Sequence, residues 1–305
     1  MKDFLALSDL TRDQLQQIFD TAFALRQQRQ AGQPNPPLLA GRTLAMIFDK
    51  ASLRTRVSFE QAIVELGGHA IILGDDEVGL GRRESVSDVA RVLAGMVHGI
   101  IARVSEHQKL LDMADAVPVP VINALSDRCH PVQVLADAMT LMDEFGKDLA
   151  GRTLAFIGDG HNVARSLAMI CAMLDMQFVI ATPPGYELDS AFVDDMQVAF
   201  PGVNVQMTSD ASEAVREADA VYTDTWVSMG QENEAERRRV VFADYQINAK
   251  LLKGQPEHGI VLHCLPAYRG KEITDEIMDG ARSRIFGQAF NRLHAQKGLL
   301  ALLFE

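Results

Sequence analysis

The feature that most constrains the fold is an alternation of short apolar runs with helical patterns, which occurs twice along the chain. In the first half the helical patterns lie near residues 54–66, 84–97 and 106–115, and they separate the apolar runs TLAMIF, HAIIL, GIIAR and VPVIN. In the second half helical segments separate the runs TLAFIGDG, QFVIATPP, NVQMT, AVYTD and GIVLHC. Such alternation is typical of parallel sheets with crossover helices.

The sequence therefore predicts an α/β fold of two doubly wound lobes, each a mainly parallel sheet with helices on both faces, joined by bridging helices. The 305 residues exceed the usual size of one domain, which also favours two lobes. The chain is expected to begin with a helix over 11–30, where apolar residues recur at helical spacing and Thr11 can serve as the N-cap.

Two further helices are expected to connect the lobes. The segment 131–146 opens with a proline in the favoured first turn and is expected to lead into the second lobe. The last helix, near 287–303, is expected to return to the first lobe. The predicted domains are residues 1–135 together with 287–305, and residues 136–286.

Composition excludes several classes of partner. A net charge of −12 argues against binding to nucleic acid or to an anionic membrane, because both polyanions would be repelled. The cysteines, Cys129, Cys171 and Cys264, form no disulfide framework, which fits a reducing compartment. The N-terminal stretch lacks the features of a signal peptide, and no apolar stretch is long enough to span a bilayer. A cytoplasmic protein is expected.

The first strand candidate is followed by FDKASLRTRVSFE, residues 48–60. Ser52 can cap a helix that starts near Leu53, which would leave first-turn N–H groups to bind an anion. Arg54 and Arg56 would lie about 200° apart on that helix and cannot both point at one ligand. Arg56 is expected to be structural, paired with Glu60 one turn on. The Gly-rich loop with lysine that binds nucleotide phosphates is absent from the sequence.

Two more loops should meet the same edge of the first sheet. Arg103 ends the run GIIAR, and His130 precedes another helix start with Gln133 on its first turn. Each alone is an ordinary surface or capping residue. Together with Arg54 they offer guanidinium, imidazole and amide groups suited to a phosphate and a neighbouring carbonyl.

In the second half, TLAFIGDGHNVA resembles a weak dinucleotide-binding fingerprint, with Gly158 and Gly160 before a helix. An oxidoreductase would need an acid at the end of the next strand to hold a ribose hydroxyl. That strand ends in Ala181-Thr182-Pro183, so the dinucleotide interpretation is disfavoured. Asn162, at the helix start, remains available to a polar ligand.

The run AVYTD ends in Asp224, and Ser228, Met229 and Gly230 follow in the next loop. A carboxylate, a hydroxyl and exposed backbone N–H groups could together hold an ammonium and a carboxylate. This combination points to an amino acid as the ligand.

The run GIVLHC places His263 and Cys264 just past another strand, and Pro266 favours an extended path for the residue before it. Cys264 could be a nucleophile, an inert buried thiol or a thiolate that pairs with an amine. Metal binding is the least favoured interpretation, because the histidines and cysteines lack a compact ligand spacing.

Four motifs in this order resemble the aspartate/ornithine carbamoyltransferase family: SLRTR at 52–56, HPVQ at 130–133, DTWVSMG at 224–230 and HCLP at 263–266. The similarity extends over essentially the whole chain. In that family the first two motifs mark the carbamoyl phosphate site, and the last two mark the ornithine branch.

The resemblance implies a role for each matching residue. Carbamoyl phosphate would be held by Ser52, Leu53, Arg54, Thr55, Arg103, His130, Gln133, the carbonyl of Leu265, and Arg292. Ornithine would be held by Asn162, Asp224, Ser228, Met229 and Cys264. The catalytic residues would be Arg54, Arg103 and His130, which polarise the carbamoyl oxygen, and Cys264, which lies against the side-chain amine with Asp224.

The implied reaction is direct attack of the neutral δ-amine of ornithine on the carbamoyl carbon through a tetrahedral intermediate, giving citrulline and phosphate. No metal, cofactor or covalent enzyme intermediate is implied, and the family's assembly is a homotrimer or a multiple of trimers. Runner-up substrates are putrescine and N-acetylornithine.

Two of the departures from the family pattern bear on carbamoyl phosphate binding. Gly79 stands where ornithine enzymes commonly have glutamine, and Val104 stands where threonine is usual. Either Arg82 or Arg83 compensates for the glutamine, or carbamoyl phosphate binds less tightly. These departures keep a non-catalytic paralogue as an alternative.

Overall fold

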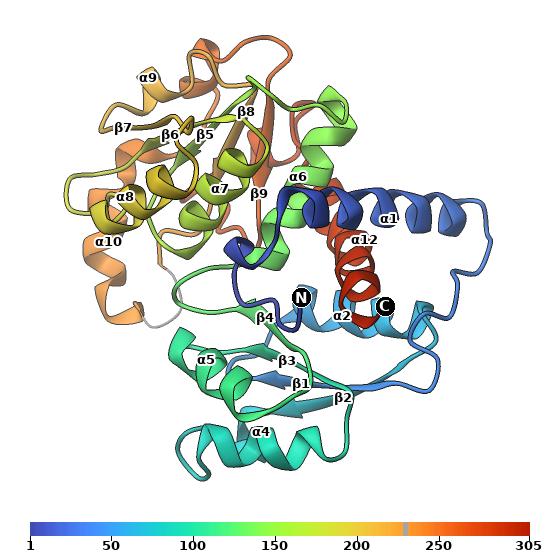
Figure 1. Cartoon of the computed structure of the whole chain (residues 1–305). Helices are drawn as coiled ribbons and strands as arrows, with labels where there is room; N and C mark the ends of the chain where they lie inside the picture. The colour runs from blue at the N-terminus through green and yellow to red at the C-terminus, as the bar shows by residue number, and fades with distance from the viewer. Residues whose placement is uncertain (228–230) are drawn as a thin grey trace. The chain divides into compact units, whose positions relative to one another are not determined.

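The computed structural model describes residues 1–227 and 231–305 (Figure 1). It divides into two compact units. The first comprises 1–136 and 290–305, and the second comprises 137–289. Two helices, α6 (Pro131–Phe145) and α12 (Ile285–Phe304), contain residues of both units. None of the described helices is both long and apolar enough to cross a membrane.

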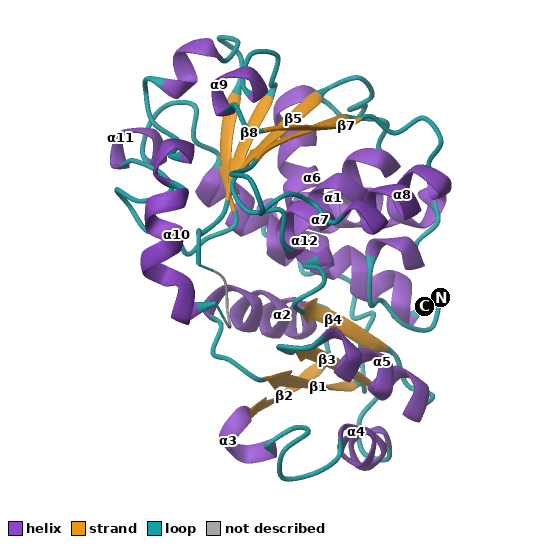
Figure 2. Cartoon of the chain, turned by 90° about the vertical axis from the view of Figure 1, so that its left-hand side faces the viewer, coloured by secondary structure: helices purple, strands orange, loops and turns teal. Residues whose placement is uncertain are grey.

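The first unit contains a four-stranded parallel sheet in the order β2-β1-β3-β4. Its strands are β1 (Thr43–Phe48), β2 (His69–Gly74), β3 (Gly99–Arg103) and β4 (Val121–Leu125). The helices between them are α2 (Leu53–Glu65), α3 (Asp75–Val78), α4 (Val86–Ala94) and α5 (His107–Ala116). Figure 2 shows α2 on one side of this sheet and α4 on the other, as right-handed crossovers require.

Strand periodicity decides which side chains each helix layer covers. In β1, Ala45 and Ile47 lie in one apolar cluster with Val89 of α4 and Leu110 of α5. The alternate residues of β1 are also buried, because the sheet is covered on both faces. The core of the first unit is therefore layered around its sheet.

The remaining helices of the first unit are η1 (Leu7–Asp9), α1 (Arg12–Gln30) and the end of α12. The predicted cap of α1 is confirmed, since the Thr11 side chain accepts a hydrogen bond from the Gln14 N–H. Gly298 brings α12 close to α1, because a Cβ at that position would lie 2.3 Å from the carbonyl oxygen of Ile18. The C-terminal part of α12 is thereby packed within the first unit.

Lys297 anchors α12 by burying its ammonium group, which donates to Glu65 at 2.7 Å and to Asn35 at 2.6 Å. Burial alone would raise the pKa of Glu65, but hydrogen bonds from Lys297, Gln61 and Arg29 lower it to about 2. On the same helix His294 has a pKa lowered to about 4 by burial and by nearby cations, Lys297 first among them.

We expect the free energy of unfolding to decrease as the pH falls from about 6.5 towards about 4. The folded pKa of His294 lies below its ordinary value of 6.5, so in this window the unfolded chain binds more protons than the folded one. After allowance for solvent screening, His294 should contribute about 1–2 kcal/mol to the decrease. Glu65 should not contribute above pH 4.5, because its own decrease lies between 4.5 and about 2.

Chemical unfolding at a series of pH values measures this dependence, and His294→Gln should flatten it. An unchanged slope in the His294→Gln protein would contradict the assignment.

The second unit contains a five-stranded parallel sheet in the order β7-β6-β5-β8-β9. Its strands are β5 (Thr153–Ile157), β6 (Gln177–Ala181), β7 (Val205–Thr208), β8 (Ala220–Thr223) and β9 (Ile260–His263). The α-helices are α7 (Asn162–Met173), α8 (Ser190–Ala199), α9 (Ala211–Ala214), α10 (Ala235–Val241) and α11 (Asp275–Met278). Short 3₁₀ helices are η2 (Glu232–Glu234), η3 (Ala243–Tyr245) and η4 (Leu251–Gly254).

The predicted fold class is confirmed: each unit is an α/β layer structure around a parallel sheet. The strands lie within a few residues of the predicted apolar runs, and the two expected connecting helices are α6 and α12.

Candidate active site

The candidate residues of the first unit lie at the carboxyl edge of its sheet. Strands β1 and β3 are neighbours, but the chain leaves β1 in the direction of β2 and later returns to place β3 on the other side of β1. This is the switch point at which ligands of open α/β sheets bind. The loop 49–52 and Arg103, the last residue of β3, meet there, as predicted.

Helix α2 begins at Leu53 with Ser52 in the N-cap position, as expected, but the expected side-chain cap is absent. The Ser52 side chain accepts no hydrogen bond from the first turn. Its hydroxyl is therefore not used in capping and can serve a ligand together with the first-turn N–H groups. Arg56 is exposed and lies 3.8 Å from Glu60, so its expected pairing one turn on is confirmed. The two arginines are separated as helix geometry predicts, since Arg54 is more buried than Arg56.

Arg292 joins three helices at this edge. It is 1% exposed, and its guanidinium donates to the Thr55 hydroxyl at 2.8 Å and to the side-chain oxygen of Gln133. Thr55 and Gln133 lie in the first turns of α2 and α6. A buried guanidinium thus holds together the two helix starts that carry SLRTR and HPVQ, which sequence spacing alone could not show.

His130 lies among the arginines of this edge. Its pKa is well below the ordinary value because the ring is buried, and because Arg292, Arg103 and Arg54 disfavour a further positive charge. The imidazole is therefore neutral near pH 7, and it can donate one N–H to an oxygen without adding a further positive charge beside the arginines. A neutral donor beside several guanidinium groups suits an anion with an adjacent carbonyl.

Gly79 and Val104, two departures from the family pattern, lie in different surroundings. Gly79 ends α3 with φ +60°, and a Cβ there would lie 2.9 Å from the Cβ of Arg83. Val104 is buried in the apolar cluster beneath α4 and α5. Arg82 is paired with Asp75, and Arg83 is exposed with its nearest carboxylate, Glu84, at 4.0 Å. The positive φ and the close approach of Arg83 therefore favour glycine at position 79.

In the second unit the candidates also lie at a switch point. Strands β5 and β8 are neighbours, and the chain reaches β6 and β7 on one side before it returns to β8 and β9 on the other. Asn162 is the first residue of α7 after β5, and Asp224 directly follows β8. Asn162 is buried, and its side-chain oxygen accepts the Val163 N–H at 2.8 Å.

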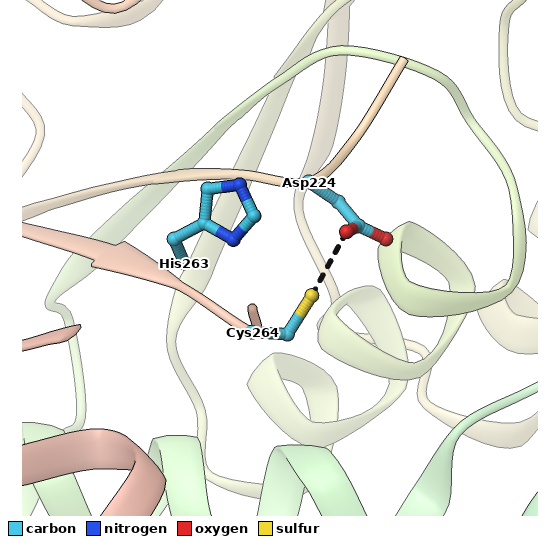
Figure 3. Close-up of side chains that lie close together, drawn as sticks. All are labelled: Asp224, His263 and Cys264. Atoms are coloured by element: carbon cyan, nitrogen blue, oxygen red, sulfur yellow. Dashed lines mark hydrogen bonds between the residues drawn. The ribbon is translucent and has the colours of Figure 1, made fainter. Parts of the chain in front are cut away.

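Figure 3 shows the thiol of Cys264 directed at the carboxylate of Asp224, to which it donates at 3.0 Å. The same carboxylate oxygen accepts the Thr225 N–H at 2.7 Å. A carboxylate beside a sulfur atom is suited to receive an amine.

His263, in the same view, is fixed on both sides. Its Nδ1 accepts the Leu265 N–H at 2.9 Å, so its Nε2 is the atom that carries a proton towards Glu272, 3.2 Å away. Both side chains are fully buried. Glu272 was missed by the sequence analysis, because a single acid in a loop carries no spacing signal.

The path after His263 differs from the prediction. Leu265 was expected to be extended, but it has φ +58° and precedes a cis peptide bond to Pro266. The Nδ1 of His263, two residues earlier, accepts the Leu265 N–H in this left-handed conformation, so a local side-chain contact accompanies the change in the path of the backbone.

Asp224, His263 and Cys264 also form a group with metal-ligand chemistry, since their donor atoms all lie within 4.8 Å of one another. They come from the ends of β8 and β9, which explains why sequence spacing did not reveal the group. A metal ion would have to displace the hydrogen bonds already made by both ring nitrogens and by the thiol.

Ser228 and Met229, which the sequence analysis also assigned to ornithine, lie outside the described residues.

The glycines of the weak dinucleotide fingerprint serve another purpose. The N–H of Gly160 donates to the carbonyl of Tyr186 at 2.8 Å, and a Cβ on Gly160 would lie 2.5 Å from the backbone of Glu187 and Leu188. The loop after β6 thus occupies the space beside this glycine. Close approach of the chain to itself explains the glycine without a pyrophosphate.

Known proteins share both halves of this arrangement. Residues 2–143 match the carbamoyl-P binding domain of aspartate/ornithine carbamoyltransferases, and residues 150–303 match their Asp/Orn binding domain. The two matches together cover nearly all of the chain. Each of its two parallel sheets presents polar groups at a switch point. The chain belongs to the aspartate/ornithine carbamoyltransferase family, and is therefore a carbamoyltransferase.

Within the family the chain is similar to an ornithine carbamoyltransferase of Methanocorpusculum labreanum, with 47% identity over 99% of this chain and 98% of that protein. It is also similar to the solved ornithine carbamoyltransferase of Pyrococcus furiosus, with a TM-score of 0.95, 44% identity, and coverage of 99% and 97%. A solved N-acetyl-L-ornithine transcarbamylase has a TM-score of 0.89 at 28% identity, with coverage of 99% and 100%.

Proposed function

We propose that this chain is an ornithine carbamoyltransferase, which transfers the carbamoyl group of carbamoyl phosphate to the δ-amine of L-ornithine and releases L-citrulline and phosphate. The observation that carries the proposal is the pair of half-sites: neutral His130 among three arginines in the first unit, and the Asp224–Cys264 pair in the second. The first suits an anionic carbonyl donor, and the second suits an amine acceptor.

The first unit supplies most of the carbamoyl phosphate contacts in this proposal. Phosphate is held by the start of α2 and by Arg103, and the carbamoyl oxygen is polarised by Arg54, Arg103, His130 and Thr55. The carbamoyl amide is held by Gln133 and by the carbonyl of Leu265. Arg292 supports the assignment, since it already orders Thr55 and Gln133.

The second unit supplies the ornithine contacts. Asn162, Asp224, Ser228 and the Met229 backbone hold the α-amino and α-carboxylate groups, and Asp224 with Cys264 receives the side-chain amine. The amine has an ordinary pKa near ~10 and must lose a proton before it attacks, so the site has to favour the neutral form.

Attack on the carbamoyl carbon moves charge onto the carbamoyl oxygen. Fixed donors at that oxygen stabilise the tetrahedral intermediate. As it collapses, the carbon–oxygen bond to phosphate breaks, and the departing phosphate takes the second proton of the attacking nitrogen. Every group in this sequence of steps is a hydrogen-bond donor, an acceptor or a charge, so the proposed chemistry needs positioning and electrostatics only. A homotrimeric assembly and a cytoplasmic location are further parts of the proposal.

We expect the purified protein to form citrulline from carbamoyl phosphate and L-ornithine without added metal. A colorimetric citrulline assay with a substrate panel tests this expectation, with putrescine and N-acetylornithine as the competing acceptors. Equal or faster turnover of either competitor would refute ornithine as the substrate. Binding of both substrates without any product would instead support the non-catalytic alternative.

A further inference from the structure

The side chain of Arg238, on α10, is almost completely buried although the residue belongs to none of the four family motifs. Its guanidinium donates to the Asp159 carboxylate at 2.5 Å, to the Trp226 carbonyl at 3.1 Å and to the Glu234 carboxylate at 2.9 Å. It also lies 4.9 Å from the centre of the Tyr186 ring. A single side chain thus contacts loops that follow three different strands.

Those loops carry the proposed ornithine residues. Asp159 lies in the loop after β5, three residues before Asn162, and Trp226 lies in the loop after β8, two residues beyond Asp224. The contact to the β8 loop is made to a backbone carbonyl, so it fixes the path of the chain and is independent of the tryptophan side chain.

Only an arginine provides this set of bonds. The guanidinium presents five N–H donors in a rigid plane, whereas the ammonium of a lysine is a point charge on a flexible stem. The planar group also lies over an aromatic ring, as guanidinium groups favour. Both carboxylates on Arg238 are hydrogen-bonded to it, so these bonds are charge-assisted and stronger than neutral ones.

We propose that Arg238 is a positioning residue for ornithine, which holds the β5 loop and the β8 loop at the separation that the amino-acid end of the substrate requires. The proposal rests on the proposed function for the identity of that substrate. Arg238 itself touches none of the reacting atoms. Its loss would let the two loops move independently, so the α-amino and α-carboxylate contacts would be made less often.

The test compares Arg238→Met and Arg238→Lys with a control on the same helix. Arg239→Met removes a neighbouring arginine that is exposed and paired with Glu236 at 3.0 Å. For both Arg238 variants we expect the KM for ornithine to rise about 10- to 100-fold, as loss of charge-assisted hydrogen bonds predicts. The KM for carbamoyl phosphate and the parameters of Arg239→Met should stay near those of the parent protein.

Calorimetry with L-norvaline provides a readout that a merely structural role would not move. Norvaline has the amino-acid end of ornithine but no δ-amine, so its affinity in the presence of carbamoyl phosphate reports the two loops without the reaction. The affinity for norvaline should fall as the KM for ornithine rises. Free guanidinium ion at low concentration should partly restore norvaline binding to Arg238→Ala, but not to Arg238→Met, whose side chain fills the space.

Several outcomes would overturn the proposal. If folded Arg238→Met binds norvaline as the parent protein does, Arg238 does not position the loops. If Arg238→Met does not fold, Asp159→Ala removes the bond to the β5 loop alone, and unchanged norvaline affinity in that variant refutes the proposal equally. A parent protein that makes no citrulline would refute the proposed function instead, so the two failures are distinguishable.

Discussion

Arg54→Ala is expected to lower kcat/KM for carbamoyl transfer by about 10²- to 10³-fold, the usual effect of removing one donor from a site that stabilises a developing oxyanion. Arg54 lies in the first turn of α2 and is only partly buried, so truncation should leave no cavity in the core. It is one of three cations near His130, with Arg103 and Arg292, and its removal takes one positive charge from the site. Steady-state citrulline assays measure the effect.

A matched control lies two residues further along the same helix. Arg56→Ala removes an exposed guanidinium whose partner, Glu60, is also largely exposed, so it should change kcat/KM by less than about twofold. Circular dichroism and thermal unfolding establish that both variants are folded. A folded Arg54→Ala protein with nearly normal kcat/KM would remove Arg54 from the mechanism.

Asp224→Asn is expected to weaken ornithine use by about 10- to 100-fold, with little change in carbamoyl phosphate binding. Among the described residues, the Cys264 thiol and the Thr225 N–H both contact the same oxygen of this carboxylate, and its negative charge suits an ammonium or amine. Asparagine keeps the shape of the side chain but removes the charge. Fluorescence or calorimetric titration with each substrate separately measures the two affinities.

The outcome that would contradict this second expectation is a loss of carbamoyl phosphate affinity as large as the loss for ornithine. Such a result would mean that Asp224 acts through the fold and has no direct role towards the amine.

Much of the arrangement was predictable because it follows from local rules. Helix periodicity separated Arg54 from Arg56, and the structure shows one more buried and the other exposed beside Glu60. The spacing of Thr11 and Gln14 predicted the cap of α1. Parallel strands place their carboxyl ends at one edge, so the convergence of the loop after β1 with Arg103 followed from the strand pattern.

The failures occurred where residue type and periodicity do not determine which contact a side chain makes. Ser52 has the composition of a capping residue, but its side chain makes no cap. Leu265 precedes a proline and was expected to be extended, yet a hydrogen bond to the imidazole of His263 accompanies a left-handed backbone. Glu272 carried no signal at all, because its importance comes only from the buried histidine that it faces.

The loop that closes over Gly160 limits what this scaffold can become. Adding an acidic residue at the end of β6, the simplest sequence change towards a dinucleotide site, would leave the backbone of Glu187 and Leu188 packed against Gly160. Redesign towards redox chemistry would therefore require rebuilding the path of the chain between β6 and α8, and point substitutions would not suffice. The second sheet has the strand order of a dinucleotide-binding fold, but the loop after β6 packs on the glycine that such a fold would keep open for its cofactor.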